Sequence, residues 1–198
     1  MRVQVVDAGV GNLRSLGNAL TACGFDHDVR REPSGPLPDA IILPGVGAFG
    51  HAAKLLADVG WTDRLREARD AGVRIVGICL GMQLLYEASE ESPGARGLGF
   101  LPGRVRRLDS SLAKVPHMSW ARLNYAGPED AGRPGWAYFV HSYAAAPSDP
   151  SSVAATAVHP EAFPAVVARG NVVGVQFHPE KSQTPGVRYL KRLVEGLP

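Results

Sequence analysis

The sequence predicts an α/β fold in one domain, residues 1–198: a central, mostly parallel sheet flanked by helices, with antiparallel strands in the second half. In the first half, short apolar runs alternate with segments of helical periodicity, which is typical of a parallel sheet with helices on both faces. Residues 99–176 are instead rich in β-branched and aromatic residues, with turn residues roughly every ten positions. The chain shows no internal repeat and no linker long enough to divide two domains.

The first elements are a strand and an amphipathic helix. Val3–Val6 is expected to form the opening strand, and a turn follows at residues 9–12. Asn12 is a good helix N-cap because its side chain can accept a backbone N–H of the first turn. Leucines at positions 13, 16 and 20 have helical spacing, and Gly24 marks the expected end of the helix.

Two apolar runs are expected to form strands that are buried on both faces of the sheet. Ala40–Leu43 is continuously apolar, and Val73–Ile78 leads directly into Cys79. A shorter strand is expected around Val29. Three helices are expected near these strands, one from Ala48, one from Trp61 to Gly72 and one over Leu80–Ala88.

The end of the chain is expected to form a hairpin and a helix. Ala165–Phe177 is the hairpin, because Gly170-Asn171 at its centre tolerates the positive φ of a tight turn. The last helix is expected to begin at Thr184-Pro185 and to run to Val194.

Composition excludes several classes of protein. The net charge of +2 is too small to indicate nucleic acid or an anionic membrane as the partner. The apolar run at the start is short and is broken by Asp7, so we expect it to be neither a secretory signal nor a membrane span. Cys23 and Cys79 lack the spacing of metal ligands, and free thiols favour the cytoplasm.

The first chemical motif is Gly77-Ile78-Cys79-Leu80-Gly81, which has the form Gly-x-nucleophile-x-Gly between a buried strand and a helix. In a nucleophile elbow the turn is so sharp that side chains at the two glycine positions would clash. The helix N-terminus favours thiolate over thiol at Cys79. The alternative is a buried structural cysteine. Cys23 lacks this context, and we expect it to pack in the core.

The second motif is Gln176-Phe177-His178-Pro179-Glu180. A thiol nucleophile needs a base, and the base needs a carboxylate that orients it. Pro179 disfavours helical geometry at His178, so we expect His178 and Glu180 to face one direction at the end of a buried strand. The alternative is a solvated His-Glu pair in a loop.

The third motif is the glycine-rich turn Pro44-Gly45-Val46-Gly47, which can present backbone N–H groups to a developing oxyanion. Residues 45–50 also match the dinucleotide fingerprint Gly-x-Gly-x-x-Gly. That fingerprint requires an acidic residue at the end of the next strand, where this chain has Cys79, so nucleotide binding is not expected.

A polar cluster is embedded in two strand-like segments, Pro116–Trp120 and Phe139–Tyr143. His117 and His141 are candidates for the site, and the alternative is that they are histidines with satisfied hydrogen bonds in the core.

Together these motifs resemble the class I glutamine amidotransferases, whose triad is Cys, His and Glu. The segments Gly11–Ser15, Pro44–Phe49, Pro116–Trp120, Phe139–Tyr143 and His178–Ser182 resemble the family of glutaminase subunits of imidazole glycerol phosphate synthase. The resemblance implies glutamine hydrolysis to glutamate and ammonia through a cysteine thioester, without a cofactor or metal. It also implies a heterodimer with a (β/α)8-barrel cyclase that makes imidazole glycerol phosphate and AICAR in histidine biosynthesis.

The resemblance also assigns roles to residues. Cys79 would be the nucleophile, His178 the base and Glu180 the residue that orients His178. The expected oxyanion hole consists of Gly45, Val46, Gly47 and Leu80; the expected glutamine-binding residues are Gln83, Glu91, His141, Ser142 and Tyr143; the expected partner interface includes Asn12, Trp120, Tyr138 and Lys181. The chain departs from the family pattern at Ala8 and Ser119, where the family usually has tyrosine and glycine.

Two other interpretations stay open at the level of the sequence. One is a glutaminase that feeds another acceptor, as in the vitamin B6 pathway, although residues 44–49 and 141–143 argue against it. The other is a non-catalytic binding protein on the same fold, since fold alone does not determine function. All three triad positions are filled, which favours an enzyme.

Overall fold

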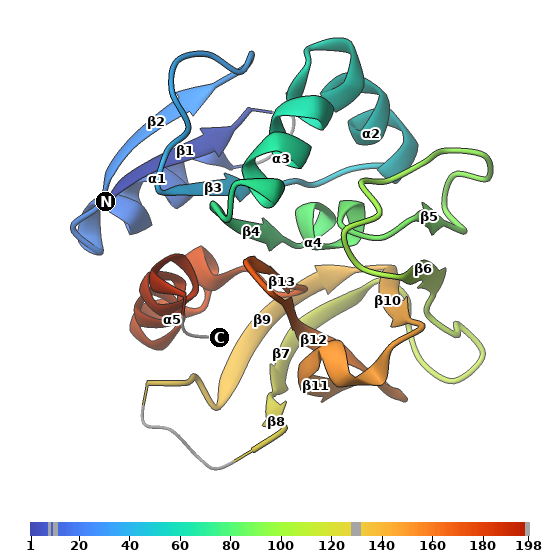
Figure 1. Ribbon diagram of the computed structural model, residues 1–198. Coiled ribbons are helices and arrows are strands. Elements are labelled where there is room, and N and C mark those ends of the chain that lie inside the picture. Colours follow the sequence, from blue (N-terminus) through green and yellow to red (C-terminus); the bar gives the residue numbers. More distant parts are fainter. Residues whose placement is uncertain (8, 10–11, 128–131, 197–198) are drawn as a thin grey trace.

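A computed structural model of the chain describes residues 1–7, 9, 12–127 and 132–196. Its largest sheet has eight strands, in the order β2-β1-β3-β4-β13-β12-β11-β8 (Figure 1). The first five strands in this order are parallel: β2 (Asp26–Arg30), β1 (Arg2–Val6), β3 (Ala40–Leu43), β4 (Arg74–Ile78) and β13 (Val172–Val175). The other three are antiparallel: β12 (Ala162–Arg169), β11 (Val153–Val158) and β8 (Asn124–Tyr125). The predicted fold class is therefore confirmed.

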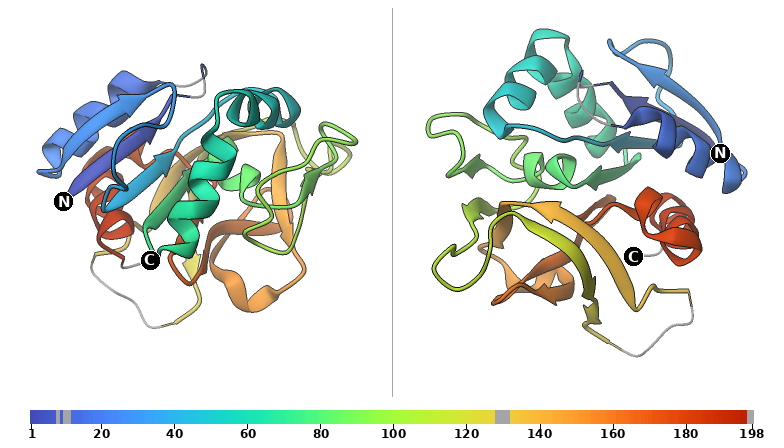
Figure 2. Two further views of the ribbon diagram at one scale, coloured as in Figure 1. Left: turned by 45° about the horizontal axis from the view of Figure 1, so that its top comes forward. Right: turned by 180° about the vertical axis from the view of Figure 1, so that it is seen from behind.

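Helices cover both faces of the parallel strands (Figure 2). One hydrophobic cluster contains side chains of α1 (Leu13–Ala22) and α5 (Gln183–Glu195). A second contains those of α2 (Phe49–Asp58), α3 (Trp61–Asp70) and α4 (Leu80–Leu84). Along β3, Ala40 and Ile42 belong to the first cluster and Ile41 and Leu43 to the second, because successive side chains of a strand point to opposite faces. This is why β3 is apolar throughout.

The predicted start and end of the first helix are confirmed. The Asn12 side chain accepts a hydrogen bond from the backbone N–H of Ser15 at 3.1 Å. After the helix, Gly24 has a φ of 81°, a conformation that glycine adopts without strain. The predicted strand around Val29 is β2.

The helix predicted over Leu80–Ala88 is wrong in length, because α4 ends at Leu84. The following loop uses the backbone carbonyls that a longer helix would need. Leu98 donates its backbone N–H to the Leu84 carbonyl at 2.8 Å, and Phe100 donates to the Leu85 carbonyl at 2.8 Å. No local sequence pattern predicts these hydrogen bonds, because the donors lie more than ten residues after the carbonyls that accept from them.

The predicted hairpin and last helix are present. β12 and β13 pair antiparallel around Gly170, whose φ is 58°. The last helix, α5, begins at Gln183 and ends at Glu195, so the predicted bounds hold to within one residue.

Two smaller sheets, formed mainly by the second half, were not delimited from the sequence. One consists of β10 (Tyr143–Pro147), β6 (Gly103–Arg107) and β5 (Ala88–Ser89). The other is a two-stranded ribbon of β7 (His117–Arg122) and β9 (Trp136–His141). Short 3-10 turns lie at Pro150–Ser152 (η1) and Pro179–Lys181 (η2). Among the described residues, no helix is long and apolar enough to cross a membrane.

Candidate active site

Cys79 stands at the sharp turn between β4 and α4, with φ at 55° and ψ at −110°. A non-glycine residue with positive φ is strained, and such strain clusters at functional sites. A side chain at Gly77 would bring its Cβ within 2.7 Å of the Gly81 carbonyl oxygen. A Cβ at Gly81 would lie 1.7 Å from the Leu43 carbonyl oxygen. The two glycines are therefore required by the turn, as a nucleophile elbow demands.

His178 and Glu180 form a buried pair. The Nδ1 of His178 lies 2.8 Å from Oε1 of Glu180, and the two side chains are only 4% and 6% exposed. The sequence predicted this pairing from an extended segment, and that reason is wrong for Glu180. His178 is extended, but Pro179 starts the 3-10 turn η2, and the turn brings the carboxylate back to the ring. The solvated alternative does not fit this burial.

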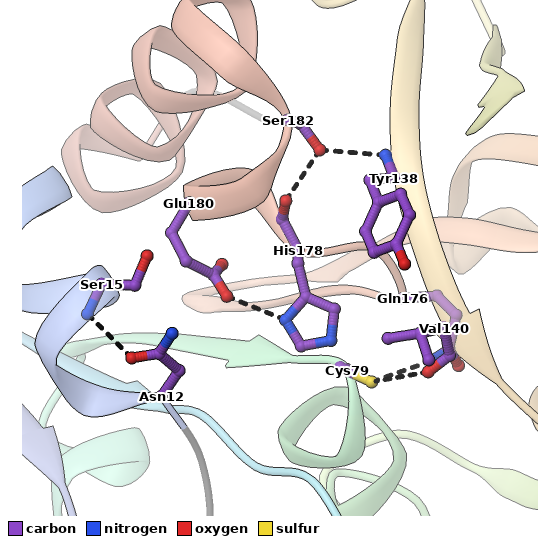
Figure 3. Close-up of polar contacts among 9 residues, drawn as sticks. All are labelled: Asn12, Ser15, Cys79, Tyr138, Val140, Gln176, His178, Glu180 and Ser182. Atoms are coloured by element: carbon purple, nitrogen blue, oxygen red, sulfur yellow. Dashed lines mark hydrogen bonds and ion pairs between the residues drawn. The ribbon is translucent and has the colours of Figure 1, made fainter. Parts of the chain in front are cut away.

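The other ring nitrogen of His178 faces the predicted nucleophile. Figure 3 shows the ring between Glu180 and Cys79, with Nε2 on the side of the sulfur. Nε2 is buried and makes no hydrogen bond to any described residue. Burial lowers the pKa of His178, but interactions with Cys79 and with Glu180 more than offset burial and raise the pKa to about 9. The arrangement therefore favours the protonated form of the His178 ring near pH 7.

Ser182 belongs to this site, although the sequence analysis quoted it only as part of a motif and gave it no role. Its buried hydroxyl donates to the His178 carbonyl at 2.7 Å and accepts the Tyr138 backbone N–H at 3.0 Å (Figure 3). The His178 N–H in turn donates to the Tyr138 carbonyl at 3.1 Å. These bonds fix the backbone of the predicted base against β9. A serine four residues after the histidine was the available signal.

Gly45, Val46 and Gly47, which we call the oxyanion strand, lie beside Cys79 and Leu80, but one donor of the predicted oxyanion hole is not free. The backbone N–H of Leu80 donates to the carbonyl of Gly45 at 3.3 Å. A carbonyl therefore occupies the position where the oxyanion would be expected to meet the Leu80 N–H. Gly47 has a φ of 105°, and Val46 is an exposed apolar side chain.

A cavity of about 270 Å³ opens at the sulfur. Its lining includes Cys79, all five predicted glutamine-binding residues and three of the predicted oxyanion residues, which are Val46, Gly47 and Leu80. Pro116 and Val140 complete the lining. Gly45 lies instead in a small neighbouring cavity with Asn12, His178 and Glu180. The Glu91 carboxylate accepts the Phe49 N–H at 2.7 Å, so it also holds the start of α2.

Of the two histidines of the polar cluster, His141 belongs to the wall of this cavity and His117 packs behind it. His141 Nδ1 lies 2.9 Å from the Tyr143 carbonyl oxygen, which can only accept, so Nδ1 carries the proton. His141 Nε2 lies 3.3 Å from His117 Nδ1, and His117 Nε2 lies 2.9 Å from the hydroxyl of Ser119. Burial lowers the pKa of His141 to about 3 and that of His117 to about 4. Both rings are therefore neutral near pH 7.

Two glutamines connect this wall to the sulfur. Gln83 Nε2 donates to the Tyr143 carbonyl at 2.9 Å and to Oε1 of Gln176 at 3.1 Å. Gln176 Nε2 lies 3.7 Å from the sulfur of Cys79 and donates to it (Figure 3). Gln176 was quoted in the sequence motif but was given no role. Its position two residues before His178 was the signal that pointed to the same site.

Three of the residues predicted at the partner interface, Asn12, Tyr138 and Lys181, lie beside His178 or Glu180. Trp120 and Tyr138 face each other across the β7–β9 ribbon, with ring centroids 6.1 Å apart. Met118 and Trp120 are exposed, and Val140, opposite Met118, lines the cavity. We call Met118, Trp120 and Tyr138 the exposed apolar face. Lys181 is exposed on η2, and Asn12 borders the small cavity behind His178.

The two departures from the family pattern have different outcomes. Ala8 lies outside the described residues. Ser119 is exposed on β7, and its hydroxyl is the hydrogen-bond partner of His117.

The chain belongs to the class-I glutamine amidotransferase family: the family described as "Glutamine amidotransferase class-I" matches residues 4–195. The resemblance seen in the motifs is thereby confirmed. Similar curated proteins carry the name "Imidazole glycerol phosphate synthase subunit HisH". That of Halobacterium salinarum is 46% identical over 98% of this chain and 92% of its own length, and that of Methylococcus capsulatus is 44% identical over 99% and 97%.

Solved structures share the fold at lower sequence identity. One titled "Crystal structure of glutamine amidotransferase" has a TM-score of 0.73 and 24% identity, covering 98% of this chain and 99% of its own. "Structure of PurLQS from Thermotoga maritima" has a TM-score of 0.75 and 21% identity, covering 97% of each chain.

Proposed function

We propose that this chain is the glutaminase subunit of an imidazole glycerol phosphate synthase. It hydrolyses glutamine to glutamate and ammonia and passes the ammonia to a cyclase partner in histidine biosynthesis. The observation that carries the proposal is the buried His178–Glu180 pair beside Cys79, which itself lines a cavity of about 270 Å³. The relatives named as HisH subunits support this partner over another acceptor.

The proposed reaction uses each member of the triad. The Cys79 thiolate attacks the side-chain amide carbon of glutamine, and a C–S bond forms as the carbonyl oxygen becomes an oxyanion. His178 gives its proton to the amide nitrogen, the C–N bond breaks and ammonia leaves. Water then attacks the thioester while His178 takes its proton, and the C–S bond breaks to give glutamate and the thiolate. Glu180 keeps the ring oriented and stabilises its charged form.

The oxyanion strand supplies the proposed control. With the Gly45 carbonyl on the Leu80 N–H, a donor is missing where the oxyanion develops. A rotation of the peptide plane at Gly45 would free that donor, and glycine permits such a rotation. The loss of one donor costs about 10²–10³ in rate, so this rotation would act as a switch.

The exposed apolar face is the proposed docking surface for a (β/α)8-barrel cyclase in a heterodimer. Its aromatic pair Trp120 and Tyr138 is of the kind enriched at the centre of interfaces. Tyr138 is also bonded through its backbone to Ser182 and His178, so a partner seated there touches the strand that holds the base. Ammonia released at Cys79 would pass to the partner without entering solvent.

The remaining expectations belong to the same proposal. The reaction as written needs no cofactor or metal, and the partner is a protein, not nucleic acid or a membrane. A cytoplasmic location suits a nucleophilic thiol, because that compartment keeps cysteines reduced.

The test is incubation with glutamine, with and without a cyclase subunit and its acceptor. The proposal expects the two chains to form a complex on size-exclusion chromatography, and expects glutamate and the cyclase products together. Glutamate without any effect of the cyclase would favour a glutaminase for another acceptor. No glutamate under any condition would favour a non-catalytic protein.

A further inference from the structure

A chain of hydrogen bonds in the cavity wall ends on the Cys79 sulfur, and its direction follows from one group. The backbone carbonyl of Tyr143 can only accept, so it accepts the Nδ1–H of His141 and an amide hydrogen of Gln83, each at 2.9 Å. The amide nitrogen of Gln83 must therefore be the atom that faces this carbonyl.

The orientation of Gln83 determines that of Gln176. Gln83 Nε2 has a second hydrogen and lies 3.1 Å from the terminal amide of Gln176. If Gln176 turned its own NH₂ group this way, two donors would meet in a buried place, which is unfavourable. Gln176 therefore presents Oε1 to Gln83. Its Nε2 is then directed at the Cys79 sulfur, and the distance between these two atoms is 3.7 Å.

We propose that Gln176 is a catalytic residue whose amide N–H stabilises the Cys79 thiolate. The inference rests on the proposed function, because it concerns the thiolate that attacks glutamine. Gln176 is fully buried and Gln83 nearly so, so water does not compete for these bonds. Cys79 and Gln83 lie at the start of α4 and within it, whereas Gln176 follows β13, and the pairing of β4 with β13 brings the two segments together.

The other neighbours of the sulfur show why a donor is needed. The carbonyl oxygen of Val140 lies 3.9 Å from the sulfur, where it can accept from a thiol but repels a thiolate. His178 supplies a positive charge on the side of its Nε2. The amide of Gln176 adds a neutral donor that does not change its charge when His178 gives up its proton. The thiolate formed again after each turnover then still has one fixed donor.

The test is the pH dependence of the alkylation of Cys79 by iodoacetamide, followed by peptide mass mapping with Cys23 as the reference thiol in the same chain. Gln176→Met keeps the length of the side chain and removes the donor. We expect its alkylation midpoint to lie about one pH unit above that of the wild type. At pH values above both midpoints the two rates should converge, since every molecule then carries a thiolate. Gln176→Glu should shift the midpoint upward further, because its carboxylate repels the thiolate.

The matched control is Gln4→Met. Gln4 is also a buried glutamine of the sheet, but it lies on β1, two strands away from β4, which leads into Cys79. This variant should keep the wild-type midpoint. Thermal unfolding shows whether each Gln176 variant is folded. If only one of them is folded, its alkylation midpoint alone tests the inference, because both variants lack the amide donor.

Two outcomes overturn the inference while the proposed function stands. One is an unchanged midpoint in a folded Gln176 variant, and the other is a loss of reactivity by the same factor at every pH, which would assign Gln176 a structural role. A wild-type Cys79 no more reactive than Cys23 would instead contradict the proposed function itself.

Discussion

The triad and the oxyanion strand both lie beside Cys79, but they differ in the hydrogen bonds that they already make. His178 and Glu180 are in contact at 2.8 Å and are buried, with the free ring nitrogen toward the sulfur. In the oxyanion strand, by contrast, the carbonyl of Gly45 occupies the N–H of Leu80 at 3.3 Å. The groups that generate the nucleophile are thus in place, whereas the group that stabilises the transition state is engaged elsewhere.

This difference suggests where the control of the enzyme lies. A thiolate that is always formed does not hydrolyse glutamine at a high rate as long as the oxyanion of the transition state lacks a hydrogen-bond donor. The triad is held by side chains and by the turn η2, while the oxyanion strand depends on the orientation of one glycine peptide. The following predictions separate the two regions, in order of expected effect.

Cys79→Ala should remove the contribution of the triad altogether. Glutamine-dependent synthesis by the complex should fall on the order of 10⁶-fold, whereas synthesis from added ammonium salts should stay nearly intact. Measurement of both activities on one preparation checks this, with Cys23→Ala as the control. Equal loss of both activities would mean that the change damages the fold or the interface.

Glu180→Gln should damage the triad less, because a glutamine can still hold a ring nitrogen but cannot stabilise the imidazolium. We expect a fall in glutaminase turnover on the order of 10²–10⁴. Steady-state kinetics at saturating partner is the measurement. Full activity would show that Glu180 is dispensable and that the site works as a Cys-His dyad.

Trp120→Ala should affect the link between partner and oxyanion strand, not the triad. Affinity for the cyclase should drop about 30-fold, the size expected of an aromatic at the centre of an interface. Alkylation of Cys79 should be unchanged. Trp136→Ala is the matched control, since Trp136 is exposed on the same ribbon but pairs with Arg122, farther from the cavity. Equal effects of the two changes would move the docking surface away from the exposed apolar face.

The histidines of the cavity wall should respond to acid in the opposite sense to His178. Burial lowers the pKa of His117 to about 4 and of His141 to about 3, below the value of about 6.5 in an unfolded chain. Their contribution to stability is therefore complete above pH 6.5 and is lost as the pH falls toward 3–4. The unfolding temperature should drop by several degrees between pH 7 and 4.5. His117→Gln should lose less over this interval, and an identical drop would show that His117 also titrates normally in the fold.

Much of the fold can be predicted from the sequence, because buried strands and tight turns have recognisable local sequence patterns. The continuous apolar run Ala40–Leu43 coincides with β3, and Gly170-Asn171 marks the turn of the predicted hairpin. The length of α4 does not follow, because it depends on the loop that bonds to Leu84 and Leu85. The β7–β9 ribbon was likewise not delimited, since its pairing joins segments that are distant in sequence.

The candidate site shows the same limit. The motifs around Cys79 and His178 pointed to one centre, and the structure brings these residues together. The roles of Ser182 and Gln176 depend on hydrogen bonds to other strands, which no spacing rule expresses. The bond between Gly45 and Leu80 depends on a peptide orientation that glycine leaves open in the sequence.

The difference between the two regions is tested most directly by two rates measured on the isolated chain and on the complex. One is the alkylation of Cys79 by iodoacetamide, and the other is steady-state glutaminase turnover with cyclase and an acceptor analogue. We predict that alkylation changes little, while glutaminase turnover rises at least about 10²-fold on addition of both. An isolated chain that already hydrolyses glutamine at the rate of the complex would contradict the proposed role of the Gly45 carbonyl.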